Sequence, residues 1–303
     1  MKKISLVSSI ILSFIFVFYW CHARVDSSQH ADLVIFSYNR PLQLYALLES
    51  IEKHISGLHE IHVIYRADDP YISAYKEVFL AYSTVISHHQ SVQPNNFRDL
   101  TFQASFASPT PYILFAVDDI VVKEDINCTQ CIQYLERENA YGFFLRLGTH
   151  LSECYPLRCK QPLPHLQEVE PNVFKWMFSQ ATLDWAYPHT VDMTLYRKKD
   201  IESQLRSISF HNPNRLEGAW HSFTRSKLSC SGLCFKNAKI VNLPLNRVQN
   251  DFNNRAMNEI SPSDLLKIFN DKKKIDIAPL ATIVNNAAHM EYTPSFITRV
   301  GYG

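Results

Sequence analysis

Glycine is scarce in this chain of 303 residues, which contains only seven. With so few glycines, neither a G-x-G-x-x-G turn nor a P-loop can be written, so the fingerprints of dinucleotide-binding Rossmann domains and P-loop NTPases are missing. The metalloprotease motif H-E-x-x-H is also missing, in spite of 13 histidines, and so is the G-x-S-x-G nucleophile elbow. Nothing in the sequence therefore points to these enzyme classes.

The chain also lacks an excess of charge of one sign. Its 30 Lys and Arg residues and 29 Asp and Glu residues leave a net charge of +1. A nucleic-acid-binding domain normally shows a clustered basic excess, so we expect no nucleic-acid partner. Hydrophobic residues make up 46% of the chain, which is typical of a globular protein and argues against disorder. The length suffices for one large domain, with or without a C-terminal addition.

Residues 1–24 have the pattern of a targeting segment. Lys2 and Lys3 precede an uncharged, mostly apolar stretch over 4–20. A short basic region before an apolar run is typical of a signal peptide or of an uncleaved signal anchor, and both alternatives stay open. In either case we expect residues 25–30 to form a linker. The folded part would then be exported or membrane-anchored, on the lumenal or extracytoplasmic side.

Six cysteines beyond Cys21 fall into close pairs, which are 128 with 131, 154 with 159, and 230 with 234. An even number of cysteines in an exported chain predicts disulfide bonds, whose connectivity cannot be deduced from spacing. Free buried thiols and a zinc site are the alternatives. Asn127 begins the sequence Asn-Cys-Thr and is either a glycosylation acceptor or the cap of a helix.

Apolar runs alternate with amphipathic segments in the first half of the chain. Short apolar runs predict strands at 32–37, 61–65, 84–88, 111–117 and 141–147. Between them, helical patterns cover 41–54, a segment ending near 80, 95–107 and 129–139. Such alternation predicts an α/β fold with a mostly parallel sheet flanked by helices.

The alternation breaks after about residue 148. Four prolines between 156 and 171 and a cysteine pair predict long loops over 149–189. Farther on we expect strands at 191–196 and 239–243, and helices starting near 199, at 214–224 and at 261–270. The chain is therefore divided into a first half at 31–150, a loop-rich region at 151–260 and a C-terminal helical extension at 261–303.

Two adjacent carboxylates, Asp118 and Asp119, directly follow the apolar segment 111–117. Holding such a pair together is costly unless a cation neutralises it, and Mg²⁺ or Mn²⁺ prefers oxygen ligands of this kind. The alternative is a solvated turn that caps the next helix. Polar residues also follow two other predicted strands, at 37–40 and 68–69. Since the carboxyl ends of parallel strands share one edge, where ligands bind, these groups are expected to meet there.

The segment 112–119 resembles the strand and acidic metal-binding motif of family 2 glycosyltransferases. The segments 34–41 and 61–69 resemble the first strand and turn, and the second strand, of the same family, in the same order and with fitting spacing. The resemblance covers 31–150 well and the remainder loosely. It implies a GT-A fold, which is Rossmann-like, and a nucleotide sugar as donor.

The resemblance also implies roles for single residues. Asp119 would bind the Mn²⁺ or Mg²⁺ ion that holds the donor diphosphate, with Asp118 beside it against the metal or the ribose. The remaining nucleotide contacts would come from Tyr38 and Asn39 in the pocket, from Asp68 or Asp69 on the nucleobase, and from Arg98 on the nucleotide. Arg98 has a second interpretation as a surface arginine of its helix.

Glu217 lies in the later, loosely matched region, where the family carries a carboxylate that acts as general base. The chemistry needs this group opposite the leaving diphosphate, so that it can deprotonate the attacking hydroxyl, and the reaction inverts the anomeric carbon. The alternative is a glutamate in the first turn of a helix. Asp184 and Asp192 are alternative bases, and Trp185 and Trp220 either stack on a sugar ring or belong to the core.

The resulting prediction is a metal-dependent, inverting glycosyltransferase. Its expected partners are a nucleotide sugar, a glycan or other hydroxyl acceptor, and a membrane through the N-terminal segment. A catalytically silent domain of the same fold, binding a glycan or a protein, is the alternative from another class. A nucleotidyltransferase would normally bring a Gly- and Lys-rich first loop, which is missing here.

Overall fold

The computed structural model describes residues 27–248, 251, 255–257 and 260–299. The predicted targeting segment at 1–24 and residues 25–26 of the predicted linker lie outside the described residues. The remainder of the predicted linker at 25–30 is described, and its residues 27–29 form a short 3₁₀ helix. Within the described part, no helix has the length and apolar character needed to cross a membrane.

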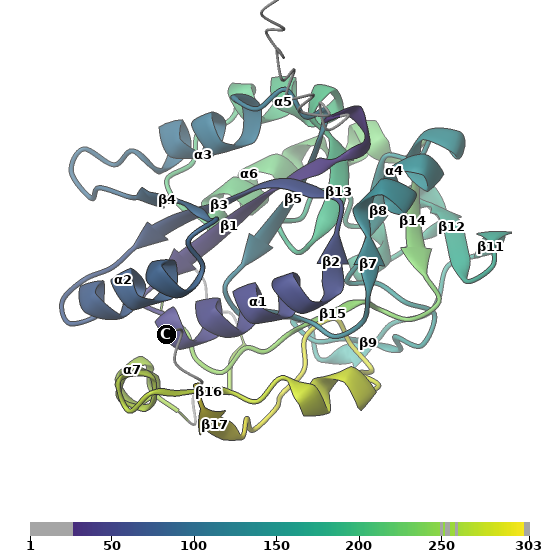
Figure 1. Cartoon of the computed structure of the whole chain (residues 1–303). Helices are drawn as coiled ribbons and strands as arrows, with labels where there is room; N and C mark the ends of the chain where they lie inside the picture. Colours follow the sequence, from purple (N-terminus) through teal and green to yellow (C-terminus); the bar gives the residue numbers. More distant parts are fainter. Residues whose placement is uncertain (1–26, 249–250, 252–254, 258–259, 300–303) are drawn as a thin grey trace, which may run out of the picture.

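A nine-stranded sheet forms the centre of the molecule (Figure 1). Its strands, in spatial order, are β11 (Gln167–Glu170), β12 (Val173–Met177), β14 (Ser231–Phe235), β8 (Gly142–Phe144), β13 (Thr194–Arg197), β5 (Tyr112–Val117), β1 (Ala31–Tyr38), β3 (Leu58–Arg66) and β4 (Ile86–His89). Only β12 and β13 run against the rest of this sheet. The predicted α/β class with a mostly parallel sheet is therefore confirmed.

Helices cover both faces of the sheet (Figure 1). One face packs against α1 (Pro41–His54), α2 (Ile72–Ala81), α4 (Cys128–Arg137) and α7 (Pro262–Asn270). The other packs against α3 (Phe97–Phe106), α5 (Lys198–Ser207) and α6 (Pro213–Trp220). Along β1, Leu33 and Ile35 face the first core and Val34 and Phe36 face the second. A strand buried on both faces reads as a continuous apolar run, which is why this one could be predicted.

Short paired strands lie outside the central sheet. They are β2 (Ile55–Ser56) with β7 (Ile126–Asn127), β6 (Ile120–Val122) with β15 (Ile240–Asn242), β9 (Glu153–Cys154) with β10 (Cys159–Lys160), and β16 (Lys273–Ile275) with β17 (Phe296–Thr298). The short 3₁₀ helices are η1 (Ser27–Gln29), η2 (Phe178–Gln180), η3 (Leu183–Ala186), η4 (His221–Lys227) and η5 (Ala278–Thr282). The β6–β15 pair matters most for the site, because it brings the later half of the chain next to Asp118 and Asp119.

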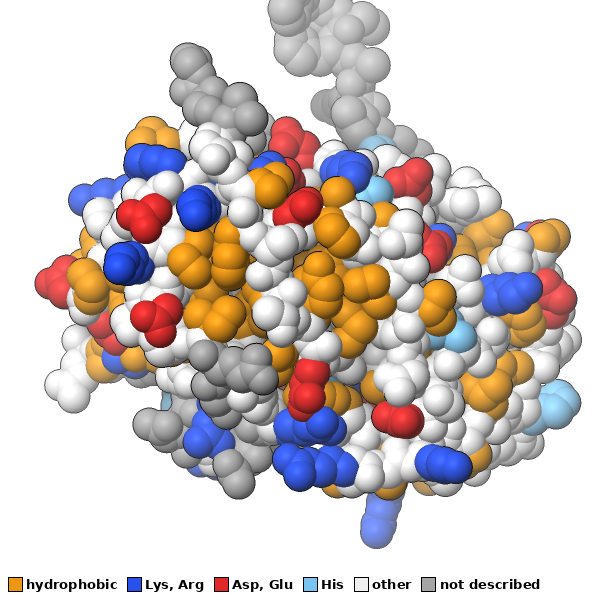
Figure 2. Space-filling view, turned by 90° about the horizontal axis from the view of Figure 1, so that it is seen from below, with side chains coloured by type: hydrophobic (Ala, Val, Ile, Leu, Met, Phe, Trp, Pro, Cys, Tyr) orange, Lys and Arg blue, Asp and Glu red, His pale blue; other side chains and the backbone are white. Residues whose placement is uncertain are grey.

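The surface agrees with the nearly balanced charge. On the face that α7 covers, acidic and basic side chains are interspersed with apolar patches (Figure 2).

The prediction of long loops over 149–189 is wrong in part. The hairpin of β11 and β12 lies in this segment, and β12 pairs with β14 to extend the central sheet. The prolines that suggested loops at 156, 162, 164 and 171 all lie outside these strands. A proline-rich composition therefore concealed a strand that begins directly after the last of them.

The predicted disulfide bonds are absent, since all six described cysteines are free thiols. Cys128 and Cys131 both lie on the buried face of α4, in the core. Cys230 and Cys234 are separated along the nearly extended chain that leads into β14, and four extended residues span more than a disulfide can bridge. The cap interpretation of Asn127 is confirmed, because its side chain accepts a hydrogen bond from the backbone N–H of Gln130.

Candidate active site

The acidic pair lies at the carboxyl end of β5, beside the turn that follows β1. Both oxygens of Asp118 are engaged, because Oδ2 accepts hydrogen bonds from Ser37 Oγ and the Tyr38 N–H, at 2.9 and 3.1 Å. Oδ1 accepts from Arg40 Nη1 at 3.0 Å. Among the described residues, Oδ1 accepts only this one hydrogen bond and keeps a second lone pair, so the predicted metal role of Asp118 stays a prediction.

Arg40 places a positive charge beside the acidic pair, where the sequence analysis predicts a metal ion. Its Nη1 lies 3.0 Å from Asp118 Oδ1 and 3.6 Å from Asp119 Oδ2, and its side chain is only 12% exposed. Nε donates to Asn246 Oδ1 at 3.1 Å, and Nη2 donates to the Asn246 backbone oxygen. Arg40 therefore joins the acidic pair to the later half of the chain.

Asp119 differs from its neighbour in having a free oxygen. Its Oδ1 is buried and has no hydrogen-bond partner among the described residues. Burial, opposed by the charge of Arg40 and assisted by the charge of Asp118, raises the pKa of Asp119 to about 6. A buried carboxylate oxygen that lacks a donor fits a divalent cation. The residues present therefore fit a metal at Asp119, and the predicted role of Asp118 beside it stays a prediction.

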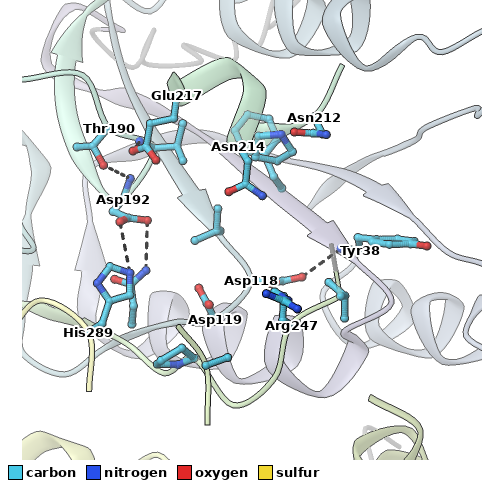
Figure 3. A pocket seen from close by; sticks show the side chains of 18 of the residues that line it. Tyr38, Asp118, Asp119, Thr190, Asp192, Asn212, Asn214, Glu217, Arg247 and His289 are labelled. Atoms are coloured by element: carbon cyan, nitrogen blue, oxygen red, sulfur yellow. Dashed lines mark hydrogen bonds and ion pairs between the residues drawn. The ribbon is translucent and has the colours of Figure 1, made fainter. Parts of the chain in front are cut away.

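Glu217 and Asp192 face the acidic pair from the opposite side of the site (Figure 3). Asp192 Oδ1 accepts from Asn242 Nδ2 at 3.2 Å, and Oδ2 lies 4.0 Å from His289 Nε2. Both Asp192 and His289 act electrostatically on Asp119, although on the chain they lie far from it. Asp192 and His289 therefore influence the charge of Asp119, and both line the same cavity.

Glu217 lies on α6, which begins at the cap residue Asn212 and at Pro213. Its Oε1 accepts a hydrogen bond from the Val191 N–H at 3.1 Å. Burial and the negative charge of Asp192 raise the pKa of Glu217 to about 7, against the smaller effects of its hydrogen bonds and of Arg146. A carboxylate with a pKa near neutral is suited to accept a proton at physiological pH.

Asp68 accepts hydrogen bonds from two of the other predicted nucleotide-binding residues. Its Oδ2 accepts from Tyr38 Oη at 2.6 Å and from Asn39 Nδ2 at 3.1 Å. Tyr38 lines the central cavity together with Arg66, whose guanidinium lies 4.6 Å from the Tyr38 ring centre. Asn39, Asp68 and the exposed Asp69 do not line it. Asp68 thus positions Tyr38 and Asn39, and its predicted contact with a nucleobase stays a prediction.

Arg98 points away from the cavity. It donates to the backbone oxygens of Ile208 and Arg206, at 3.2 and 2.9 Å, and stacks on Phe102. The structure therefore favours the surface interpretation of this arginine, which fastens α3 to the end of α5. Trp185 and Trp220 are both fully buried, so the core interpretation of these rings is confirmed.

Arg146 is a buried cation that the sequence analysis did not identify. It follows β8, is 2% exposed, and its Nη1 lies 3.2 Å from Asp184 Oδ1. Asp184, an alternative base in the sequence analysis, is thus already in an ion pair. Arg40 follows a predicted strand, which was its one signal in the sequence. Arg146 lies within the predicted strand 141–147, so it carried no strand-end signal and is found beyond β8 only in the structure. Asn242, Asn246 and His289 carried no such signal.

A cavity of about 890 Å³ connects these groups along the carboxyl edge of the parallel strands. Its walls include Tyr38, Arg40, Asp118, Asp119, Arg146, Asp184, Asp192, Glu217, Asn246, Arg247 and His289. Its size is in the range of small-molecule and cofactor sites. The predicted meeting of strand-end residues at one edge is therefore confirmed for 37, 38, 40 and 118–119, which line the cavity. Asp68 meets Tyr38 and Asn39 at this edge without lining the cavity.

A separate acidic and histidine group lies at the other edge of the sheet. Among the described residues, Asp32, His59 and Glu60 place possible metal-ligand atoms within 4.8 Å of one another. Both oxygens of Asp32 are already paired, with Lys198 Nζ at 2.6 Å and with His59 Nδ1 at 3.1 Å. None of these residues lines the cavity, so this group is not the predicted metal site.

The protein therefore has an α/β fold with a cavity at the carboxyl edge of its parallel strands, and several carboxylates line this cavity. No family model matches the chain. The bifunctional glycosyltransferase pgtA of Dictyostelium discoideum is 23% identical in an alignment 276 residues long, and the match covers 80% of this chain and 36% of that protein. The chain thus spans about a third of the length of this relative. This similarity agrees with the resemblance to glycosyltransferases.

Solved structures of S. aureus TarS are also similar. One has a TM-score of 0.45 and 12% identity, over 68% of this chain and 35% of TarS. A second, of TarS residues 1–349 in complex with UDP, has the same TM-score and identity, over 68% of this chain and 58% of that one.

Proposed function

We propose that this chain is a glycosyltransferase that moves a sugar from a nucleoside diphosphate sugar to an acceptor hydroxyl, with inversion. The main support for the proposal is that Asp119 and Glu217 line the same cavity and face each other from opposite sides of it (Figure 3). The sequence similarity to a glycosyltransferase supports it.

In the proposed reaction, Glu217 accepts the proton of the acceptor hydroxyl while the oxygen attacks the anomeric carbon. The bond from that carbon to the phosphate oxygen breaks, and the diphosphate leaves with the electron pair. Attack opposite the leaving group inverts the anomeric centre. The raised pKa of Glu217 suits it to take a proton near neutral pH.

Asp119 would hold a divalent cation, Mn²⁺ or Mg²⁺, assisted by Asp192 and His289. What such an ion supplies is neutralisation of charge on the departing diphosphate. Arg40 pairs with Asp118, which also accepts the Tyr38 N–H, so these contacts hold the turn after β1 in place. Tyr38 and Arg66 form the wall on the β1–β3 side, where the nucleoside would bind.

The proposal includes the location of the enzyme. Residues 1–24 would export or anchor the chain, which places the cavity on the lumenal or extracytoplasmic side of a membrane.

Transfer itself tests the proposal. The full chain is incubated with a panel of nucleotide sugars, Mn²⁺ and a mixture of glycans, and release of nucleoside diphosphate is measured. Transfer by the wild type, reduced about 10²- to 10⁴-fold in Glu217→Gln, is the expected result. Equal rates for the two proteins would remove Glu217 from the proposed role.

A silent domain that binds a glycan or a protein is the second candidate. The observation that favours it is the ion pairing of Arg40 with Asp118 and Asp119, since it satisfies part of the charge that a metal would otherwise neutralise. Absence of nucleotide binding with retained glycan binding would select this candidate.

A further inference from the structure

Arg146 and Asp184 form a polar pair in the cavity wall. Arg146 Nη1 donates to Asp184 Oδ1 at 3.2 Å, and Nη2 donates to the Asp184 backbone oxygen at 3.4 Å. Gln161 fixes the pair from behind, because its Oε1 accepts a hydrogen bond from the Asp184 N–H at 2.9 Å. Arg146 and Asp184 line the cavity, while Gln161 does not.

Each member of this group has a polar atom left over. Arg146 Nε, Asp184 Oδ2 and Gln161 Nε2 are buried and have no hydrogen-bond partner among the described residues. Unpaired buried donors and acceptors are unfavourable, so a wall built this way is suited to a ligand that supplies partners. Here the wall offers both a donor and an acceptor. A hydroxyl group can match both, because it donates one hydrogen bond and accepts others.

The surrounding charges disfavour an anionic ligand group. Arg146 interacts electrostatically with Asp184, Asp192 and Glu217, so its single positive charge is already shared among three carboxylates. A phosphate or sulfate at this place would meet those carboxylates. Hydroxyls of a sugar ring suffer no such repulsion.

The strand order separates this pair from the nucleoside side of the cavity. Tyr38 ends β1, whereas Arg146 follows β8, and β5 and β13 lie between these two strands in the sheet. The pair therefore lies on the far side of the acidic turn, with Glu217 and Asp192. In the proposed reaction this side receives the acceptor.

We propose that Arg146 and Asp184 form a subsite that recognises a ring hydroxyl of the acceptor, and that the acceptor is itself a sugar. This inference rests on the proposed function for the assignment of the acceptor side. Asp184 then acts in recognition instead of serving as the base, and Gln161 is a positioning residue.

Binding of simple sugars, without any nucleotide, tests this subsite. The full chain is titrated by NMR with methyl glycosides of common hexoses and with their monodeoxy analogues. For the wild type, removal of one particular hydroxyl should weaken binding about tenfold or more, because the wall atoms lose their partner. In Asp184→Ala the parent and that deoxy analogue should bind within about threefold of each other. Asp184→Asn, which keeps the shape of the side chain, replaces it if the alanine variant fails to fold.

Glu202→Gln is the matched control, since it removes a carboxylate from an exposed pair with Arg206 outside the cavity and should keep the wild-type discrimination. Unchanged discrimination in both Asp184 variants would overturn the proposal, as would binding of no glycoside by the wild type. Weakened binding of a nucleotide sugar alone would also overturn it, by assigning the pair to the donor. Failure of nucleotide binding or transfer, with glycoside discrimination intact, would reject the proposed function and leave this subsite standing.

Discussion

At the scale of single residues, the two neighbouring aspartates have different environments. Every oxygen of Asp118 accepts a hydrogen bond, from Ser37, Tyr38 and Arg40, so its charge is stabilised by the fold itself. Asp119 keeps one buried oxygen without a partner among the described residues, and its pKa is raised. The first carboxylate therefore shapes the turn, and the second is the group available to a ligand.

This difference predicts opposite effects on stability. The folded-state pKa of Asp119 is about 6 against an ordinary value of 3.8, so its charge opposes folding at neutral pH. The penalty is absent below pH 3.8, grows as pH rises, and is complete above about 6. Without metal, Asp119→Asn should raise the free energy of unfolding at pH 7.5 by roughly 1–3 kcal/mol, with no gain near pH 4. Denaturant unfolding at the two pH values measures this.

Asp118→Asn provides the comparison, because it loses charged hydrogen bonds and should destabilise the protein at pH 7.5 by roughly 1–3 kcal/mol. Equal changes in the free energy of unfolding for Asp118→Asn and Asp119→Asn would contradict the different roles of these two residues.

The pH dependence of transfer should follow Glu217. A general base acts only when unprotonated, so kcat should rise with pH through about 7 and then level off. Since the charge of Asp192 raises the pKa of Glu217, Asp192→Asn should move this acid limb to lower pH. A pH–rate profile of both proteins checks the shift. An acid limb that does not move in Asp192→Asn would show that Asp192 does not raise the pKa of the general base.

Site residues that directly follow apolar strands could be predicted from the sequence. Asp118 and Asp119 were identified in this way, because parallel strands bring their carboxyl ends to one edge. Arg40 follows β1, the direct neighbour of β5, so its contact with the acidic pair was open to the same argument. Asn246 and His289 reach the site from irregular segments, whose course in space has no periodic signal in the sequence.

At the scale of elements, η3 depends on the packing of β12 and β14. Trp176 of β12 donates its indole N–H to the Trp185 backbone oxygen at 2.8 Å, next to Asp184. Gly232 of β14 lies so close that an added Cβ would be 2.6 Å from the Trp176 ring. The position of Asp184 therefore depends on this tightly packed contact.

Gly232→Ala should disturb both stability and the site. Overpacking against a buried tryptophan costs about 1–3 kcal/mol, and the Trp176 ring packs against Phe144 and against Trp185 of η3. We expect a lower melting temperature together with weaker glycoside binding. Thermal unfolding and the NMR titration measure the two effects. An unchanged melting temperature would contradict the prediction, because it would mean that the contact between Gly232 and Trp176 has room for an added methyl group.

The helices and strands of the first half could be predicted because the residues within each segment determine its structure. The segment 41–54 was predicted as a helix and forms α1, which has Pro41 in its first turn and Lys53 and His54 in its last. β14 was missed, since a short strand containing a glycine carries little local signal and exists through its pairing with β8 and β12.

At the scale of the whole molecule, we propose that residues 1–24 export or anchor the chain. We expect the full chain to enter the secretory or export pathway when expressed in a eukaryotic host, and a chain without 1–24 to stay in the cytosol. Fractionation with a protease-protection assay compares the two. Identical distributions would reject the targeting role of this segment.

The central claim is that the cavity binds a nucleoside diphosphate at Asp119. Calorimetric titration of the full chain with a panel of nucleoside diphosphates, with and without Mn²⁺, tests this claim most directly. We predict metal-dependent binding of one nucleotide, lost in Asp119→Ala and retained in the exposed control Glu202→Gln. Failure of every nucleotide to bind, or binding that is unaffected by Asp119→Ala, would contradict it.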